Sequence, residues 1–346
     1  MEIPTADPAH CIWYRGMEPQ FVSHLLQDGS DLYASVSAPG VTLTQRKVRS
    51  DSCVYALPVI MFIQTGSAAM PFRTILTTTS FGFSDRDLDV TARLCEEVEA
   101  HLSVLVIALA APPPIGSAGS LALVWLEEHE ENIKRLDART AAVSALLAGY
   151  PLSTDVCSEY AELGRGDDVI GRRARYADLT VIGPDVLAGE SLREEIIEGA
   201  LFHSGKPLLL IPQATAPTLK PKRVLIAWDS RIEAARAVRE SLQMLKGADE
   251  VHLVLVDPVQ GENYHGEEPG ADAATYLARH GVKVTIDRLP AINRSVADVL
   301  RQHALDTSAN LMIMGAYGHS RLRERFFGGV TKSMLSECPL PLLLAR

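Results

Sequence analysis

The sequence predicts two consecutive α/β domains, each a doubly wound, parallel five-stranded sheet. Two observations carry this prediction. From residue 222 onward, short runs of Val, Ile and Leu alternate with segments that have the apolar spacing of amphipathic helices. The segment 73–212 repeats the same order of elements. Near-continuous apolar strands that alternate with helices are typical of parallel sheets covered on both faces, so the chain holds this unit twice.

The second copy shows the pattern more clearly. Its first strand is expected at Arg223–Trp228 and its first helix at Ile232–Leu245. A helix ending near His280 is followed by Gly281, a common residue just after a helix. The remaining strands are expected at Val251–Val256, Val282–Ile286, Asn310–Met314 and Leu340–Leu344, and the remaining helices at Ser295–Leu305 and after Gly328.

The first copy is aligned by short matches to the second. Ala177-Asp178-Leu179 matches Ala309-Asn310-Leu311 at the fourth strand. At the first strand, Arg73–Leu76 matches Arg223–Ile226 with a larger offset. The first copy therefore contains extra residues, which we place in 112–149. Its strands are expected at Thr74–Leu76, Val104–Leu109, Leu179–Ile182 and Leu208–Ile211.

These matches predict domains over residues 70–213 and 222–346, joined by a short linker rich in Pro, Thr and Ala, Gln213–Pro221. Residues 1–69 form an atypical head that fits neither copy, and Val54–Ile63 is its candidate strand. Met70 directly precedes the first predicted strand of the repeat. We hypothesise that the natural polypeptide starts there and that the head is poorly ordered or a start-site artefact. A real but atypical extension is the alternative.

Composition narrows the class of protein. The net charge is −10 and no basic block offsets it, which argues against general nucleic-acid binding. No apolar run approaches the roughly 18 residues of a membrane-spanning helix, and the first residues do not form a signal peptide. The five cysteines are scattered, as expected of reduced thiols in a cytoplasmic protein.

The glycines after the fourth strand of the second copy predict a phosphate-binding loop. In an open α/β sheet, ligands bind beyond the carboxyl ends of the strands, where strand order reverses. Glycine lets backbone N–H groups approach a ligand, and the helix that follows adds unpaired N–H groups and a positive dipole end. A tight strand-to-helix turn without a ligand is the alternative. The glycines are Gly315, Gly318, Gly328 and Gly329.

The spacing Gly-x2-Gly-x9-Gly, closing on Gly-Val-Thr, resembles the ATP-binding signature of the universal stress protein family. The resemblance covers Arg73–Arg346 as a tandem pair. It implies an adenine nucleotide alpha hydrolase-like fold with strand order 3-2-1-4-5, and ATP, with Mg²⁺, as the ligand. By this resemblance the nucleotide site consists of Ala227, Asp229, Val256, Met314, Gly315, Gly318, Gly328, Gly329, Val330 and Thr331. His319 directly follows Gly318 and is added as a residue that can approach a phosphate, with a solvated loop residue as the alternative.

The resemblance also assigns roles within this site. It places Asp229 and Val256 at the adenine end of the nucleotide. Thr331 is expected to add a hydroxyl donor to the phosphates. Gly329 departs from the family pattern, because ATP-binding members usually carry Ser or Thr there, so one phosphate-contacting hydroxyl is missing.

The first copy has a degenerate version of this loop. Gly183 matches Gly315, but bulky residues replace the later glycines and would block the approach of a phosphate. We therefore expect the N-terminal domain to bind no nucleotide and to be structural. The replacements are Val186 for Gly318, Ile196-Ile197 for Gly328-Gly329 and Thr79 for Asp229.

Other nucleotide-binding and metal-binding patterns are absent from the sequence. The first strands lead to Asp229-Ser230-Arg231 and Thr79-Ser80-Phe81 rather than to GxGxxG, and no GxxxxGK[ST] is present. His265 and the glutamates around it fit no metal-ligand template. We therefore expect neither a dinucleotide-binding domain, a P-loop nor a metal site.

The sequence favours a stress-response regulatory protein that binds an adenine nucleotide in its C-terminal domain. No general base or Walker-type lysine stands out, so binding is expected rather than catalysis. A slow ATPase and a nucleotide-free interaction scaffold are the alternatives. The family resemblance implies that the fifth strands, Leu208–Ile211 and Leu340–Leu344, pair within one chain as a pseudo-dimer, which would cover two exposed edges. A homo-oligomer of such chains is a further option.

Overall fold

The computed structural model describes residues 23–28, 31–36, 72–113, 120–259, 268–316 and 329–346. The chain divides into two units, Met1–Ser67 and Ala68–Arg346. In the first unit the described residues form an antiparallel hairpin of β1 (Ser23–Asp28) and β2 (Asp31–Val36). The sequence analysis predicted no element there, although Asp28-Gly29-Ser30-Asp31 is typical of a two-residue hairpin turn. The candidate strand Val54–Ile63 lies outside the described residues.

The second unit contains both predicted copies, called here the N-terminal half (β3 to β7) and the C-terminal half (β8 to β12). The elements of the N-terminal half are β3 (Thr74–Thr79), α1 (Arg86–Val98), β4 (His101–Ala110), α2 (Ser120–Leu147), β5 (Thr154–Glu162), α3 (Gly166–Ala174), β6 (Leu179–Ile182), α4 (Pro184–Ala188), α5 (Ser191–Glu198), a π-helical turn (Gly199–Ser204) and β7 (Leu208–Leu210). Those of the C-terminal half are β8 (Arg223–Ala227), α6 (Ile232–Lys246), β9 (Glu250–Val256), α7 (Ala271–Arg279), β10 (Val284–Leu289), α8 (Val296–Asp306), β11 (Leu311–Gly315), α9 (Gly329–Ser336) and β12 (Leu342–Ala345).

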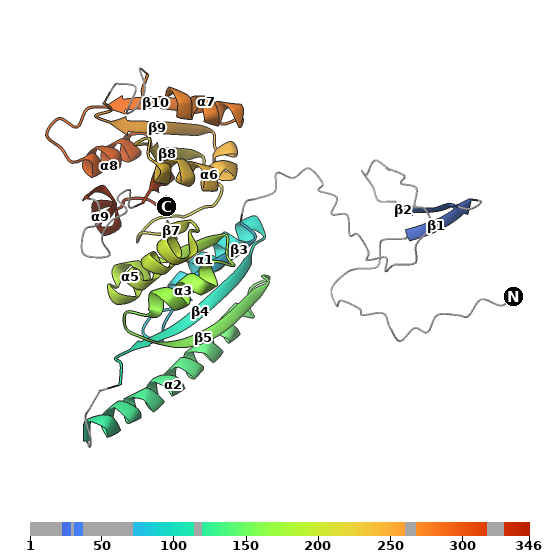
Figure 1. Cartoon of the computed structure of the whole chain (residues 1–346), viewed down its shortest axis with the longest axis vertical. Helices are drawn as coiled ribbons and strands as arrows, with labels where there is room; N and C mark the ends of the chain where they lie inside the picture. The colour runs from blue at the N-terminus through green and yellow to red at the C-terminus, as the bar shows by residue number, and fades with distance from the viewer. Residues whose placement is uncertain (1–22, 29–30, 37–71, 114–119, 260–267, 317–328) are drawn as a thin grey trace. The chain divides into compact units, whose positions relative to one another are not determined.

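The described strands of the second unit form one ten-stranded sheet in the order β10-β9-β8-β11-β12-β7-β6-β3-β4-β5 (Figure 1). Within each half all neighbours are parallel and the order is 3-2-1-4-5, which confirms the predicted fold class. The halves meet at their fifth strands, where β12 runs antiparallel to β7 and Leu343 lies opposite Leu209. The two strand edges that the sequence left as candidates for pairing are therefore covered by each other.

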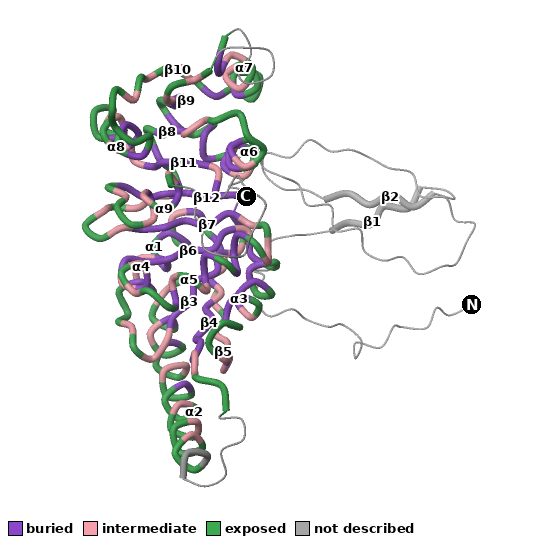
Figure 2. The backbone as a smooth tube through the Cα atoms, turned by 60° about the vertical axis from the view of Figure 1, so that its left-hand side comes forward, coloured by how far each residue is buried: buried purple, intermediate pink, exposed green. Residues whose placement is uncertain are grey.

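Both faces of the sheet are buried, as the apolar runs predicted. In β8, Val224 and Ile226 join the core on one face and Leu225 joins the core on the other. In Figure 2 the central strands are buried along most of their length, and the exposed positions lie mainly on the helices and connecting loops around the sheet. Alternate side chains of a strand point to opposite faces, so a strand between two helix layers needs apolar residues at every position. No helix among the described residues is long and apolar enough to cross a membrane.

The strand register corrects the alignment of the two copies by one residue. Leu179 pairs with Ile75 in the N-terminal half, and its match Leu311 pairs with Val224 in the C-terminal half. Ile75 therefore corresponds to Val224, and Ser80 rather than Thr79 stands at the position of Asp229. The prediction at Thr79 was wrong because both first strands are buried on both faces for most of their length, so no alternation of exposed and buried side chains fixes their register.

The extra residues of the first copy lie in its second helix. α2 has 28 residues, whereas α7, the corresponding helix of the C-terminal half, has 9. α2 lies along the outer edge of the N-terminal half, beside β5 (Figure 1). The placement of the insertion in 112–149 is thus confirmed.

Candidate functional site

The predicted residues on the strands gather at the point where strand order reverses in the C-terminal half. β8 has β9 on one side and β11 on the other, so the carboxyl ends of β8 and β11 border the crevice typical of ligand binding in this architecture. Met314 pairs with Ala227 across these ends, and Val256 is the last residue of β9. Met314 is buried, while Ala227 and Val256 are half-buried. The structure thus brings these three predicted residues to one edge of the sheet.

Asp229 stands on the sharp turn between β8 and α6. Its Oδ1 accepts the backbone N–H of Arg231 at 3.1 Å, and its Oδ2 lies 3.7 Å from the Arg231 Nε. Ser230 has a φ of 61°, a left-handed conformation that turns the chain into the helix. The Asp229 side chain is 58% exposed, so the carboxylate stands at the mouth of the crevice and is open to a ligand from solvent.

Gly315 fits against the first turn of α6. A Cβ atom at this position would lie 2.5 Å from the Ala234 N and 2.6 Å from the Glu233 carbonyl carbon. Both neighbours are backbone atoms of a helix, so they have little freedom to move away. Gly315 is therefore required for the packing of β11 on α6, whether or not a ligand binds.

The start of α9 forms the other described side of the predicted loop. A Cβ atom at Gly329 would meet no atom within 4 Å, so a larger residue fits there. Val330 is half-buried, and Thr331 is only 5% exposed. The hydroxyl predicted to reach the phosphates thus belongs to a buried side chain. The remaining predicted loop residues, Gly318, His319 and Gly328, lie outside the described residues.

The N-terminal half has a closely matching turn, and its own carboxylate occupies it. A Cβ atom at Gly183 would lie 2.3 Å from the Cγ of Asp87, in the first turn of α1, just as Gly315 abuts Glu233 in the first turn of α6. Asp87 is 2% exposed. Its carboxylate accepts the backbone N–H groups of Asp185 at 2.9 Å and Val186 at 2.8 Å. The turn after this fourth strand therefore holds a carboxyl group through two backbone donors.

Burial affects the pKa of this carboxyl group. Burial raises the pKa of Asp87 above its usual value, while the hydrogen bonds from Asp185 and Val186 act in the opposite direction. Val186 is 1% exposed, and Ile196 and Ile197 on α5 are also buried. The turn after β6 is thus filled by a buried carboxyl group of the chain itself, beside the buried Val186.

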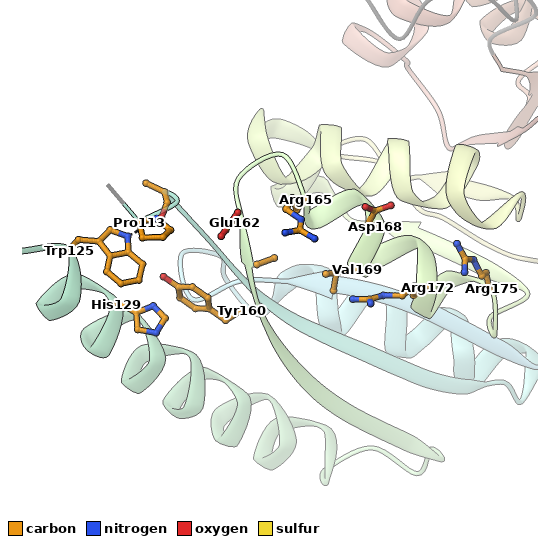
Figure 3. A pocket seen from close by; sticks show the side chains of 12 residues that line it. Pro113, Trp125, His129, Tyr160, Glu162, Arg165, Asp168, Val169, Arg172 and Arg175 are labelled. Carbon is orange, nitrogen blue, oxygen red and sulfur yellow. Dashed lines mark hydrogen bonds between the residues drawn. The ribbon is translucent and has the colours of Figure 1, made fainter. Parts of the chain in front are cut away.

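A separate hollow of about 570 Å³ lies in the N-terminal half between α2, β5 and α3 (Figure 3). The rings of Trp125 and His129 stack with centroids 5.0 Å apart, and Tyr160 meets His129 edge-on at 4.6 Å. Arg165 and Arg172 come from the α3 side. The sequence analysis missed this hollow because its aromatic wall comes partly from the inserted α2. Two carboxylates, those of Glu162 and Asp168, lie among the arginines, so the hollow is not a purely cationic phosphate site.

Comparison with known proteins supports the fold. Residues 220–346 match the model of the Universal stress protein family. Universal stress protein Slr1230 of Synechocystis sp. is 26% identical over 146 residues, which are 41% of this chain and 47% of that protein. The chain thus spans about half the length of this curated relative.

A solved structure shares the fold at low sequence identity, and a shorter one is similar to part of the chain. A universal stress protein from Archaeoglobus fulgidus DSM 4304 superposes with a TM-score of 0.52, at 15% identity, over 80% of this chain and 97% of that one. A universal stress protein in complex with cAMP covers 37% of this chain and 98% of its own, with 17% identity and a TM-score of 0.31. The match to the Archaeoglobus protein shows that the tandem α/β arrangement occurs in a solved structure.

Proposed function

We propose that this chain, which belongs to the universal stress protein family through residues 220–346, is a stress-response regulatory protein that binds an adenine nucleotide in its C-terminal half. One observation carries the proposal. The glycine turn after the fourth strand packs on the first turn of a helix in both halves, and in the N-terminal half this turn holds a carboxylate through two backbone N–H groups. A phosphate takes the corresponding place in the C-terminal half.

The two turns differ in what fills them. Tyr317 and Gly318 follow Gly315 at the same spacing at which Asp185 and Val186 follow Gly183. The buried Val186 side chain has no counterpart at Gly318, which lets a larger anion than a carboxylate approach the backbone. The N-terminal half supplies its own anion, Asp87. The C-terminal half takes the anion from solvent, as a phosphate group of the nucleotide.

The start of α9 supports the same placement. The first N–H groups of a helix have no partner within the helix, and they carry the positive end of its dipole. At the start of α9 these are the groups of Gly329, Val330 and Thr331, so Thr331 contributes a backbone donor rather than its buried hydroxyl. Ala227 and Val256 provide the apolar wall for the adenine, and the exposed Asp229 carboxylate accepts hydrogen bonds from that end of the ligand.

The N-terminal half has a structural role in this proposal. Its fifth strand β7 covers the edge of β12, so the two halves form a pseudo-dimer within one chain and neither edge is exposed. ATP, with Mg²⁺ on its phosphates, is the proposed ligand. No catalytic residue is assigned, because the proposal is one of binding and regulation.

Mass spectrometry of small molecules released from the purified protein, followed by calorimetric titration with ATP, ADP, AMP and cAMP, tests this function. Retained or titratable nucleotide that is lost in Gly318→Val supports the proposal. ADP release with measurable turnover would instead identify a slow ATPase. No retained nucleotide and no heat of binding would leave an interaction scaffold and would overturn the proposal.

A further inference from the structure

We propose that the C-terminal half carries a site for one divalent transition-metal ion, with zinc as the best match, formed by His252, Asp287 and His303. The Asp287 Oδ2 lies 2.7 Å from the His252 Nδ1 and 2.8 Å from the His303 Nε2. One potential ligand atom from each residue lies within 4.8 Å of those from the other two. The site is independent of the proposed nucleotide loop.

The fold brings these residues together from three separate elements. His252 lies on β9 and pairs with Thr285 of β10, so Asp287, two residues further along β10, points to the same face of the sheet. α8 packs beside β9, and His303 reaches the pair from this helix. The imidazole rings of His252 and His303 meet edge to face, with centroids 5.9 Å apart. No local spacing in the sequence could have revealed this cluster.

The chemistry of the three side chains suits zinc. Two imidazole nitrogens and one carboxylate oxygen are a donor set found in zinc sites that keep a fourth position for water. Imidazole ligands favour zinc, copper or nickel over magnesium and calcium. The three side chains are only about one-fifth exposed, at 19%, 20% and 19% for His252, Asp287 and His303, so they are partly shielded from competing water yet still accessible.

The metal-free arrangement positions these ligands in advance. The single oxygen Oδ2 of Asp287 now accepts both imidazole N–H groups. Zinc binds its nitrogen and oxygen ligands at about 2.0–2.2 Å, so an ion placed between the three atoms requires a small outward shift of the carboxylate. Zinc binding through the two nitrogens that face Asp287 requires each ring to lose its proton there and to take up a proton at its other nitrogen, so that both imidazoles stay neutral and direct a lone pair at the ion. The metal then ties the edge strand β10 to α8.

A second cluster in the N-terminal half provides the internal comparison. The His203 Nδ1 lies 2.7 Å from the Asp168 Oδ1, and the His203 Nε2 lies 3.4 Å from the Asp167 Oδ2. These contacts lie on the two sides of one ring, so a single ion cannot use both nitrogens. With only one imidazole donor, this cluster is the weaker metal site.

Zinc titration of the chelator-treated full chain, without nucleotide and against a competing metal indicator, tests the proposal. We expect about one zinc ion per chain, bound at micromolar concentration or tighter, and a higher Tm in its presence. In His252→Asn and His303→Gln, an amide N–H still reaches the carboxylate but no imidazole remains. Each variant should bind zinc at least about tenfold more weakly, as expected for loss of a metal ligand. His203→Gln, the matched control, should bind as the wild type does.

Three results would overturn the metal site. The first is no zinc binding below about 100 μM, a concentration far above that at which structural zinc sites bind. The second is wild-type zinc affinity in both His252→Asn and His303→Gln. The third is loss of zinc binding in His203→Gln. Circular dichroism of each variant confirms that it is folded, and these variants retain a hydrogen-bond donor to Asp287 so that folding is preserved. Because no nucleotide is present, failure here leaves the proposed nucleotide function untouched.

Discussion

Gly183 and Gly315 stand at matching positions, at the ends of the two fourth strands, but they face different neighbours. A Cβ atom would clash with the Asp87 side chain at Gly183 and with the backbone of α6 at Gly315. In the N-terminal half Asp87 caps the turn from within the protein. In the C-terminal half the matching side chain is the half-buried Glu233, and glycine replaces the buried Val186. The difference teaches that a carboxylate of the chain itself fills the N-terminal turn, whereas the proposed function assigns the C-terminal turn to a phosphate of a bound nucleotide.

The largest expected effect is on nucleotide binding. Gly318→Val should weaken ATP binding at least about 100-fold, because a β-branched side chain there restores the blocked state of the N-terminal half. Calorimetric titration of the purified variant measures this. Gly189→Val, a substitution at a glycine with a negative φ near the N-terminal turn, is the control and should leave ATP affinity unchanged. Wild-type affinity in Gly318→Val would refute the loop assignment.

The internal anion of the N-terminal turn should make a large contribution to stability. Asp87→Ala leaves the buried N–H groups of Asp185 and Val186 without their acceptor, and the free energy of unfolding should fall by about 3 kcal/mol. Glu233→Ala, at the matching position of α6, should cost less than about 1 kcal/mol, the usual value of an acidic residue in a first helical turn. Urea denaturation compares the two. Equal losses of unfolding free energy in the two variants would mean that Asp87 does not fill its turn in a way that Glu233 does not.

Gly315 should matter for stability even without nucleotide. Gly315→Ala places a Cβ atom against the α6 backbone, and overpacking of this kind costs about 1–3 kcal/mol. The expected loss is about 2 kcal/mol in urea denaturation of the nucleotide-free protein. A variant as stable as the wild type would show that α6 shifts easily, and Gly315 would then be a residue of the ligand site alone.

Apolar patterning predicted the fold because parallel strands between two helix layers must be apolar throughout. Leu179–Ile182, predicted as a strand, has those bounds in the structure. The same patterning could not fix the register of the first strands, so the sequence alignment of the two copies was shifted by one residue and matched Thr79 rather than Ser80 to Asp229. It also could not show that Gly315 serves packing or that Asp87 fills the N-terminal turn, because both depend on contacts between distant segments. The His252, Asp287 and His303 cluster was missed for the same reason.

A moderate gain in affinity is expected at the position where the chain departs from the family pattern. Gly329→Ser adds a hydroxyl at the start of α9, where a Cβ atom meets nothing within 4 Å. One added hydrogen bond to a phosphate should tighten ATP binding roughly three- to tenfold. Gly329→Ala is the matched control, since it makes the same change in backbone freedom without the hydroxyl. Equal affinities of the two variants would show that this position does not face the phosphates.

The smallest effect should be a pH dependence of the unfolding free energy that comes from Asp87 in the N-terminal turn. Burial raises the pKa of Asp87 above the value of about 3.9 that is usual for an aspartate in an unfolded chain, so the folded protein holds this proton more tightly than the unfolded chain does. The contribution of Asp87 to stability is then complete below that value and declines as the pH rises through the pKa of the folded state. Asp87→Asn has no proton to lose there and should lack this component.

Urea denaturation of the wild type and of Asp87→Asn from pH 3.5 to pH 7 isolates that component, because all other titrating groups are common to both proteins. The unfolding free energy of the wild type minus that of Asp87→Asn should fall with rising pH and then level off. A difference that rises with pH would mean that the N–H groups of Asp185 and Val186 stabilise the charged form more than burial opposes it. The N-terminal turn would then favour the ionised form of Asp87 over its protonated form, which makes it an even closer counterpart of the phosphate proposed for the C-terminal turn.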